Sequence, residues 1–473
     1  MEQHYIGIDI GTTATKAVCF NKTGKVIRQF TKEYPMYHPE KDWSIQKPNE
    51  ILTAVLECIQ QITTDFHPQF ISFSAAMQSI MVVNKAGIPI SETMLWADNR
   101  ANLEATELKN SAEGIDFYQK TGIPIHPFSP MTKILWLKKN NPTLFARAFK
   151  FISIKEYVWY QLTGEYAIDT SMASGTGLLN IHTLEWDKTV LDYLKINSEQ
   201  LSSIVSPTYQ HKGISDNFHY IIGGSDGALA NLGTGAMVSG RMALSIGTSG
   251  AVRLPIDKPY IDTQMRTQCY HLADNQYLKL GAVNNGAIVL QWLKESLLKT
   301  DESFEELFAQ AEKIPAGSEG LLFVPYLLGE RAPIWDASAK GTLLGISINH
   351  TKAHLIRATL EGIIFGLFSV VETLIPEPEE RKKITVMASG GFGKSDLWLQ
   401  MTADIFQMKV VVSETIEGAA WGAVLIGFKA TGFPISSENK TEKTFVPNPN
   451  HKVVYEQSFK KFKQVYPLLK DIL

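Results

Sequence analysis

An aspartate, a glycine and two threonines lie close together near the start of the chain, in Asp9-Ile10-Gly11-Thr12-Thr13, and Lys16 follows shortly after them. The apolar run at 5–10 and the β-branched run at 15–20 predict two strands joined by a turn, with a third strand at 25–30. Turn amides and hydroxyls suit a phosphate, and the aspartate suits Mg²⁺, which takes one or two carboxylates with waters and substrate phosphates. The motif is not a Walker A loop. A hairpin that binds nothing stays an alternative.

A second acidic residue, Asp226, lies among glycines in Gly223-Gly224-Ser225-Asp226-Gly227, directly after the apolar run at 220–222. Glycines leave room where a substrate must approach the backbone. A carboxylate in that place is a candidate general base for a hydroxyl group. The alternative is structural, because an aspartate at this point also serves as the N-cap of a helix through 228–232.

Two further glycine turns occur in the second half. Gly247-Thr248-Ser249 separates two predicted strands at 243–246 and 251–254, as the threonine turn does near the N-terminus. This weak internal repeat suggests two related domains, although Gly-Thr hairpins are common. Gly390-Gly391, with Ser395 shortly after, follows a predicted strand at 384–387, and such a turn exposes backbone to a flat ligand. Ser395 is equally suited to be a helix N-cap.

A polar patch is predicted from two short segments, Met77-Gln78-Ser79 and Trp96-Ala97-Asp98-Asn99-Arg100. An aromatic ring, a carboxylate, amides and a guanidinium close together suit a polyhydroxylated ligand. A salt-bridged surface loop is the alternative.

The elements that would position these groups alternate between strands and helices, which favours an α/β fold. Apolar spacing predicts helices at 48–64, 352–374 and 455–469, and strands at 70–74 and around 80–83. The polar segment 436–451 is predicted to be a surface excursion.

Length and composition limit the classes of protein to which this chain can belong. The chain has 473 residues, a formal net charge of −3 and 44% hydrophobic residues, which favours two or three globular domains and excludes a basic nucleic-acid footprint and extended disorder. Three scattered cysteines indicate buried thiols in a reducing compartment. The N-terminus does not resemble a signal peptide. The longest apolar segment noted, 321–329, is too short for a membrane span, so a cytoplasmic protein is expected.

The sequence resembles the FGGY carbohydrate kinases of the actin-like ATPase superfamily over nearly its whole length. Residues 128–140, FSPMTKILWLKKN, resemble the first family signature, and residues 341–361, GTLLGISINHTKAHLIRATLE, the second. Gly329-Glu330-Arg331-Ala332-Pro333 is similar to a third motif, with Ala332 where threonine is frequent. The resemblance implies an α/β fold of two actin-like (ribonuclease H-like) ATPase domains with an interdomain cleft. Residues 1–240 would carry the sugar site and the first phosphate turn, and residues 241–473 the nucleotide site.

The resemblance also implies roles for individual residues. Asp9 would position Mg²⁺, and Asp226 would contact the sugar and take the proton from its terminal hydroxyl. The residues that would surround ATP are Gly11, Thr12, Thr13, Lys16, Gly247, Thr248, Gly286, Gly390, Gly391 and Ser395. The residues that would line the sugar pocket are Met77, Gln78, Trp96, Asp98 and Arg100.

Within the family, the segments 96–100 and 121–127 look most like gluconate kinases, with D-xylulose kinases next. Gln78 departs from both, since histidine is frequent there, and leaves the substrate open. Lys155, His126, Arg100 and Arg331 are unranked candidates for a gluconate carboxylate. The expected partners are ATP and a sugar or sugar acid, without nucleic acid or membrane, and with a homodimer as the candidate assembly. A non-kinase actin-like ATPase and a silent sugar-binding protein are the weaker alternatives.

Overall fold

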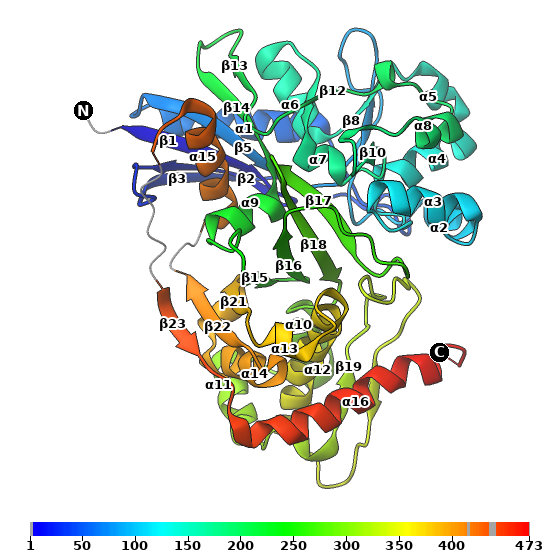
Figure 1. Ribbon diagram of the computed structural model, residues 1–473, viewed down its shortest axis with the longest axis vertical. Helices are drawn as coiled ribbons and strands as arrows, with labels where there is room; N and C mark the ends of the chain where they lie inside the picture. The colour runs from blue at the N-terminus through cyan, green and yellow to red at the C-terminus, as the bar shows by residue number, and fades with distance from the viewer. Residues whose placement is uncertain (1–2, 414–416, 435–440, 473) are drawn as a thin grey trace. The chain divides into compact units, whose positions relative to one another are not determined.

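The computed structural model describes residues 3–413, 417–434 and 441–472 (Figure 1). It contains two compact units. The N-terminal unit comprises residues 1–234, 256–278 and 417–438, and the C-terminal unit comprises 235–255, 279–416 and 439–473. These compact units differ from the predicted division into 1–240 and 241–473, because two later segments pack with the N-terminal unit.

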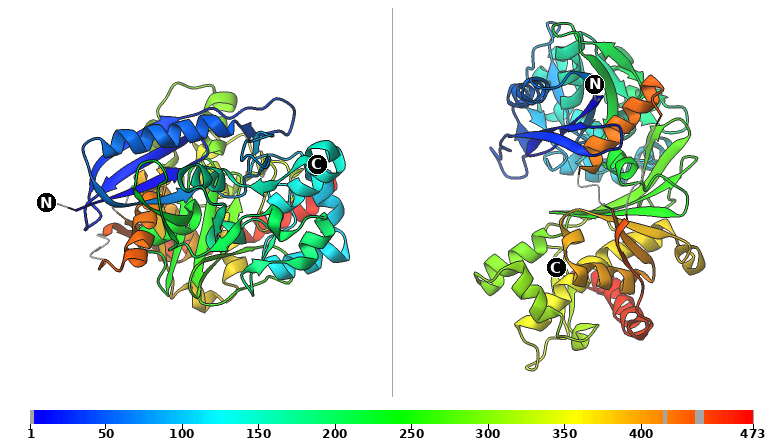
Figure 2. Two further views of the ribbon diagram at one scale, coloured as in Figure 1. Left: turned by 90° about the horizontal axis from the view of Figure 1, so that it is seen from above. Right: turned by 90° about the vertical axis from the view of Figure 1, so that its left-hand side faces the viewer.

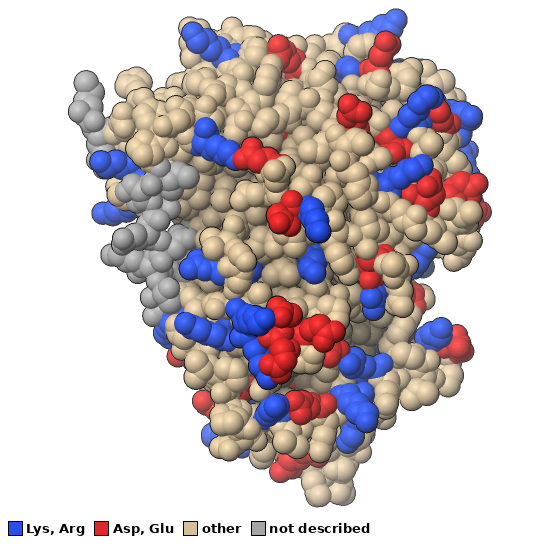
Figure 3. Space-filling view, in the orientation of Figure 1, with Lys and Arg blue, Asp and Glu red and all other residues tan. Residues whose placement is uncertain are grey.

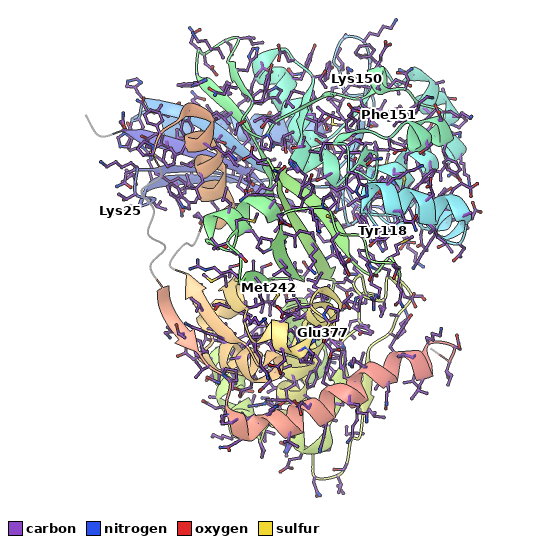
Figure 4. The ribbon with its side chains drawn as sticks, viewed as in Figure 1. Lys25, Tyr118, Lys150, Phe151, Met242 and Glu377 are labelled. Carbon is purple, nitrogen blue, oxygen red and sulfur yellow. The ribbon has the colours of Figure 1, made fainter. Side chains whose placement is uncertain are left out.

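Specific packing holds these returning segments in the N-terminal unit. Helix α15 (Gly418–Thr431) lies so close to strand β1 (His4–Ile10) that a Cβ on Gly7 would be 2.2 Å from the Ala420 carbonyl oxygen. In the segment 256–278, the Thr267 carbonyl accepts a hydrogen bond of 2.9 Å from the hydroxyl of Tyr118, labelled in Figure 4. Each contact joins residues that lie far apart in the chain, so the local spacing of apolar residues does not predict it.

The sheet of the N-terminal unit has the order β13-β14-β5-β1-β2-β3. The predicted meander is confirmed, since β1 and β2 are antiparallel and so are β2 and β3, while β5 and β14 run parallel on the other side of β1. Helix α1 packs on β2 and β3, and α15 packs on β1 and β5; the two helices cover opposite faces (Figure 2). The further bounds are β2 (Ala14–Phe20), β3 (Val26–Glu33), α1 (Pro48–Thr63), β5 (Pro68–Ala75), β13 (Gln210–Lys212), β14 (His219–Ser225) and α9 (Asp226–Gly233).

Short helices and two-stranded ladders form a second layer of the same unit, around a core that includes Ile80, Met131 and Leu191. The strand expected around 80–83 is confirmed as β6. The bounds are β4 (Ile45–Gln46), β6 (Met81–Val83), β7 (Thr93–Met94), α2 (Asn102–Lys109), α3 (Ala112–Thr121), α4 (Pro130–Asn140), α5 (Pro142–Arg147), β8 (Lys150–Ile152), α6 (Ile154–Thr163), β9 (Ala167–Asp169), α7 (Thr170–Ser174), β10 (Leu179–Asn180), β11 (Glu185–Trp186), α8 (Lys188–Leu194), β12 (Ser203–Val205) and β17 (Gln268–Ala273).

The strands of the C-terminal unit belong to a sheet of order β17-β18-β16-β15-β21-β22-β23, which has a similar layout, with an antiparallel hairpin β15–β16 beside parallel strands β21 and β22. The bounds are β15 (Arg241–Ile246), β16 (Gly250–Ile256), β18 (Gln276–Val283), α10 (Ile288–Trp292), α11 (Phe304–Ala311), β19 (Leu322–Val324), β20 (Thr342–Leu344), α12 (Lys352–Leu374), α13 (Pro378–Arg381), β21 (Thr385–Ser389), α14 (Asp396–Phe406), β22 (Lys409–Ser413), β23 (Thr441–Phe445) and α16 (Lys452–Leu469). Within the surface excursion predicted at 436–451, residues 441–445 form the edge strand β23, which was not predicted; it pairs with β22, and its Lys443 and Thr444 are exposed. Residues 435–440 lie outside the described residues.

Helix α12 shows that a long apolar segment is not sufficient evidence for a membrane span. It has the length and composition of a membrane span, yet 94% of its most apolar window is buried, as in a core helix. The choice of 321–329 as the most apolar segment was therefore wrong. Arg357 and Glu361 interrupt the run in α12, and they form a buried ion pair of 2.9 Å with each other.

The sequence predicts buried cysteine thiols and no basic nucleic-acid footprint. Cys19, Cys58 and Cys269 are buried free thiols. On the face drawn in Figure 3, basic and acidic side chains are interspersed, without a continuous basic surface.

Candidate active site

The two predicted acids meet at one edge of the N-terminal sheet. In the ladder, Asp9 of β1 pairs with Ser74 of β5, and Ser74 pairs with Gly224 of β14. Because these strands are parallel, their carboxyl ends share one edge, and this edge is where α/β sheets bind ligands. Asp226 follows two residues after Gly224 as the first residue of α9, and its Oδ1 accepts a 2.6 Å hydrogen bond from the Gly227 amide. The N-cap position is Ser225, so the alternative that Asp226 is the N-cap is wrong.

Asp9 has an environment that favours a bound cation. Its pKa is raised to about 6, by burial first and by the negative charge of Asp226 second, while a 2.8 Å hydrogen bond from the Ser74 hydroxyl and the charge of Lys16 oppose the rise. Two carboxylates that destabilise each other's charge form a site that a cation would relieve. Among the described residues no group of three acidic, histidine or cysteine side chains could hold a metal. A carboxylate in this environment fits Mg²⁺, which takes one or two carboxylates together with waters and substrate phosphates.

The first phosphate turn is joined to the polar patch. The indole N–H of Trp96 donates to the Thr12 hydroxyl at 3.1 Å, and the Gln46 side chain donates to the Thr12 carbonyl at 2.7 Å. The turn itself closes through a 2.9 Å hydrogen bond from the Gly11 amide to the Ala14 carbonyl. The Trp96 segment therefore contacts the threonine turn although the two lie 84 positions apart in the chain, a contact that the sequence did not predict.

Lys16 is positioned by a partner that sequence reasoning missed. Its ammonium group binds both carboxylate oxygens of Glu417, at 2.8 and 2.9 Å. Glu417 lies just before α15, 401 positions away along the chain. An ion pair at this place keeps Lys16 beside the turn and neutralises part of its charge.

Asp98 and Arg100 form a buried pair rather than a surface loop, which corrects the structural alternative. Asp98 is fully buried and accepts from the Arg100 side chain at 2.7 and 2.8 Å and from the Ser44 amide at 2.8 Å. The guanidinium stacks on Trp43, 3.4 Å from the ring centroid. Both residues therefore fix the shape of the Trp96 loop.

Met77 and Gln78 lie in the turn that follows β5. Met77 is packed so tightly on Gly175 that a Cβ there would be 2.1 Å from its methyl group. Gln78 has a left-handed backbone, with φ of 68°, and its side-chain amide donates to the Tyr270 hydroxyl at 2.7 Å. Tyr270 lies on β17, in the returning segment, and was not identified from the sequence.

Lys133, within the first signature motif on α4, is the most informative residue that sequence reasoning missed. Its buried ammonium group donates to three backbone carbonyls, those of Gln78, Leu95 and Phe128, at 3.1, 2.6 and 2.6 Å. Burial lowers its pKa to about 7. One cation thus fixes the two loops of the polar patch to the start of α4. A lysine in a helical pattern gives no sign of such partners.

We expect Lys133→Met to loosen these loops. The three carbonyls would lose a charge-assisted donor, so the melting temperature should fall by about 5 °C and the KM for the sugar should rise about tenfold or more, with the KM for ATP nearly unchanged. Lys139 lies on α4 as Lys133 does, and it forms an exposed ion pair with Glu107 of α2. Lys139→Met removes this pair and is the control for both measurements. An unchanged sugar KM in a folded Lys133→Met protein would contradict this role.

Lys155 is corrected as a candidate for the substrate carboxylate. It is buried and binds Asp169 at 2.7 Å and the Gly224 carbonyl at 3.2 Å. Behind Asp226, the hydroxyl of Ser171 bonds to that of Ser225 at 2.8 Å. These buried contacts hold the end of β14 from which Asp226 emerges, and the charge of Lys155 is already paired with that of Asp169. His126, also a candidate, is buried and accepts from the Phe128 amide at 3.2 Å.

The C-terminal unit holds a cavity of about 520 Å³ lined by the other predicted turns. Gly247, Thr248, Gly391 and Ser395 line it, together with aromatic and polar residues that sequence reasoning did not select, namely Gln291, Phe304, Phe308, Phe392 and Trp398. Gly390 adopts φ of 93°, and a Cβ there would be 2.6 Å from the Ile246 carbonyl oxygen. Ser395 is also the N-cap of α14. An apolar cavity with two glycine turns suits a nucleotide.

Domains of a single protein family match both halves. The N-terminal domain of the FGGY family of carbohydrate kinases matches residues 4–233, and its C-terminal domain matches residues 242–431. The chain belongs to the FGGY family of carbohydrate kinases. It is 40% identical over 455 residues to a gluconokinase of Bacillus subtilis (strain 168), covering 91% of this chain and 88% of the relative.

Two solved structures from Lactobacillus acidophilus resemble this FGGY kinase equally. One is described as gluconate kinase and the other as ligand-bound xylulose kinase. Each has a TM-score of 0.95 at 36% identity and covers 99% of this chain and 98% of its own. The fold is therefore that of the two-domain actin-like kinases, as predicted.

Gly286 supports the second phosphate turn of this FGGY kinase. A Cβ on Gly286 would lie 2.7 Å from the carbonyl oxygens of Gly247 and Ser249, and the neighbouring Ala287 amide donates to the Gly247 carbonyl at 2.7 Å. Gly286 was expected to lie close to the nucleotide. In the structure it lies directly against the backbone of the Gly247–Ser249 turn.

We expect Gly286→Ala to displace the turn and raise the KM for ATP about tenfold, a loss of about 1.4 kcal/mol in binding, while the KM for the sugar changes less than twofold. Gly366→Ala, in the same unit with open space around its Cβ position, is the matched control in steady-state kinetics. A KM for ATP within twofold of the wild-type value would contradict the proposed support.

Proposed function

We propose that the chain transfers the terminal phosphoryl group of ATP to the terminal hydroxyl of D-gluconate, which gives 6-phosphogluconate and ADP. The similarity to the Bacillus gluconokinase over most of both chains carries this proposal. The xylulose kinase name of an equally similar structure supports D-xylulose as the second candidate. A non-kinase ATPase would not need the polar patch or Asp226.

Asp226 acts as the general base in this proposal. Its place at the carboxyl edge of β14, beside Asp9 and held from behind by the Ser171–Ser225 contact, supports a carboxylate that accepts the proton of the attacking hydroxyl. A positioned base contributes about 10²–10⁴-fold to the rate. Positioning and charge stabilisation supply the remainder in phosphoryl transfer.

Two sets of residues are proposed to bind the nucleotide. Gly11, Thr12, Thr13 and Lys16 bind its phosphates from the N-terminal unit, and Gly247, Thr248, Gly390, Gly391 and Ser395 hold its phosphates, ribose and base from the C-terminal unit. Asp9 holds Mg²⁺, which supplies charge neutralisation for the phosphates when bound. The cavity volume and the environment of Asp9 support these assignments.

The sugar is proposed to lie against Met77, Gln78, Trp96 and Asp226, with Asp98 and Arg100 shaping the loop behind Trp96. Arg331 remains a candidate for binding the carboxylate of gluconate. A cytoplasmic location and a homodimer stay proposals, and the near-neutral composition supports small-molecule partners rather than nucleic acid.

A coupled ADP-release assay across gluconate, xylulose, ribulose, rhamnulose and glycerol tests the proposal. We expect kcat/KM for gluconate to exceed that for each other substrate about 100-fold, because substrate groups that leave buried polar partners unpaired are strongly disfavoured. A higher value for xylulose would favour the second candidate. Equal values for all five would overturn the proposed pocket.

A further inference from the structure

A chain of hydrogen bonds leads from Gln78 to the interior of the N-terminal unit. The Gln78 side-chain N–H donates to the Tyr270 hydroxyl at 2.7 Å, and this hydroxyl in turn donates to the Oε1 of Gln268. Gln78 is half-buried, whereas Tyr270 and Gln268 are 6% and 2% exposed. The two inner residues lie on β17, so a rigid strand of the returning segment holds the outer amide.

The backbone of Gln78 is fixed as well. A non-glycine residue at φ of 68° occupies a sparsely populated and strained backbone region, and such residues concentrate at functional sites. The Gln78 carbonyl accepts from Lys133, which is bonded at the same time to the Leu95 carbonyl. With both its backbone and its side chain held, Gln78 offers the site one preset orientation.

The direction of these hydrogen bonds decides which end of the amide faces the ligand. A tyrosine hydroxyl has one proton, so a Tyr270 that donates to Gln268 can only accept from Gln78. The side-chain N–H group of Gln78 then points to Tyr270, and the side-chain oxygen, Oε1, is the end of the amide left for the proposed sugar. Reversing the outer amide requires the inner one to reverse as well.

We propose that Tyr270 and Gln268 are positioning residues that set Gln78 to present a hydrogen-bond acceptor, so that the pocket selects a hydroxyl-bearing carbon over a ketone. D-Gluconate carries hydroxyl groups at carbons 2 to 6, whereas D-xylulose has a ketone at carbon 2. A ketone opposite a carbonyl oxygen leaves both acceptors unpaired, which is costly in a site closed to water. This inference rests on the proposed sugar site at Gln78.

Tyr270→Phe tests the relay, because it removes the hydroxyl and keeps the ring. We expect the ratio of kcat/KM for gluconate to that for xylulose to fall at least tenfold, mainly through a higher KM for gluconate. Tyr277→Phe, a buried tyrosine of the neighbouring strand, is the control and should leave the ratio unchanged. Gln268→Met removes the acceptor of the Tyr270 hydroxyl with little change of shape. If Tyr270→Phe does not fold, the same ratio of kcat/KM values is measured in Gln268→Met.

Gln268→Glu tests the direction. At pH 8.5 an ionised glutamate can only accept, so it enforces the direction described above, and the ratio should stay within threefold of the wild-type value. A collapse of gluconate activity in a folded Gln268→Glu protein would show the opposite direction and overturn the proposal. An unchanged ratio in Tyr270→Phe, or in Gln268→Met, would also overturn it. Wild-type protein that does not phosphorylate gluconate would instead refute the proposed function.

Discussion

Asp226→Asn should lower kcat for gluconate by 10²-fold or more while ATP and gluconate still bind. Asparagine has nearly the same shape, and its side-chain oxygen can accept from the Gly227 amide as the carboxylate does at 2.6 Å, so the start of α9 should be preserved. An amide cannot take the proton of the attacking hydroxyl, and the loss of a general base costs about 10²–10⁴-fold. Steady-state kinetics and calorimetric dissociation constants measure the two effects separately.

The control for this substitution is Asp192→Asn, which removes an exposed aspartate paired with Lys188 and should leave kcat unchanged. A kcat for Asp226→Asn within tenfold of the wild-type value, in a protein that binds both substrates, would rule out Asp226 as the base. A loss of ATP or gluconate binding would assign it to binding instead.

Asp9→Asn should have opposite effects on activity and on stability. Its pKa is raised from 3.8 to about 6 in the folded protein, so the folded state binds more protons than the unfolded state between these values. Wild-type stability therefore falls as pH rises from about 4 to 6, and the cost remains above pH 6. Asparagine keeps an acceptor for Ser74 and removes the charge. The gain at pH 7.5 should be about 1–2 kcal/mol, less than the full pKa shift implies because Asp9 is partly accessible to water.

The activity of Asp9→Asn should nevertheless fall about 10²-fold or more, because the Mg²⁺ that we propose at Asp9 would lose its carboxylate. Thermal melts at pH 4.5 and 7.5 measure the stability effect, and the difference from wild type should shrink at the lower pH. A lower melting temperature than wild type at pH 7.5 would contradict the assigned cost of the Asp9 charge.

Local patterns made much of the fold predictable. The meander at the N-terminus and helix α12, whose bounds match the expected 352–374, follow from residue spacing and turn chemistry alone. The strand within 441–445 was missed because its apolar content is low and its order depends on pairing with β22. The return of α15 to the N-terminal unit depends on a glycine, Gly7, that faces it from over 400 positions away.

The candidate site was predictable to a similar extent. Asp9 and Asp226 were identified within contiguous motifs, and the strand register brings them to one edge. Lys133, Glu417 and Tyr270 were missed because their roles come from partners distant in sequence. The nature of the Asp98–Arg100 pair was also beyond the sequence, since burial decides whether two such charges form a surface loop or a fixed internal support.

We expect this FGGY kinase to transfer the phosphoryl group of ATP to the terminal hydroxyl of gluconate rather than to water. Phosphorus NMR with ¹³C-labelled gluconate, followed alongside ADP release, measures this directly. We expect one phosphate ester at the oxygen on carbon 6 for each ADP formed, with almost no inorganic phosphate. ADP accompanied by an equal amount of inorganic phosphate, or an ester on another carbon, would contradict it.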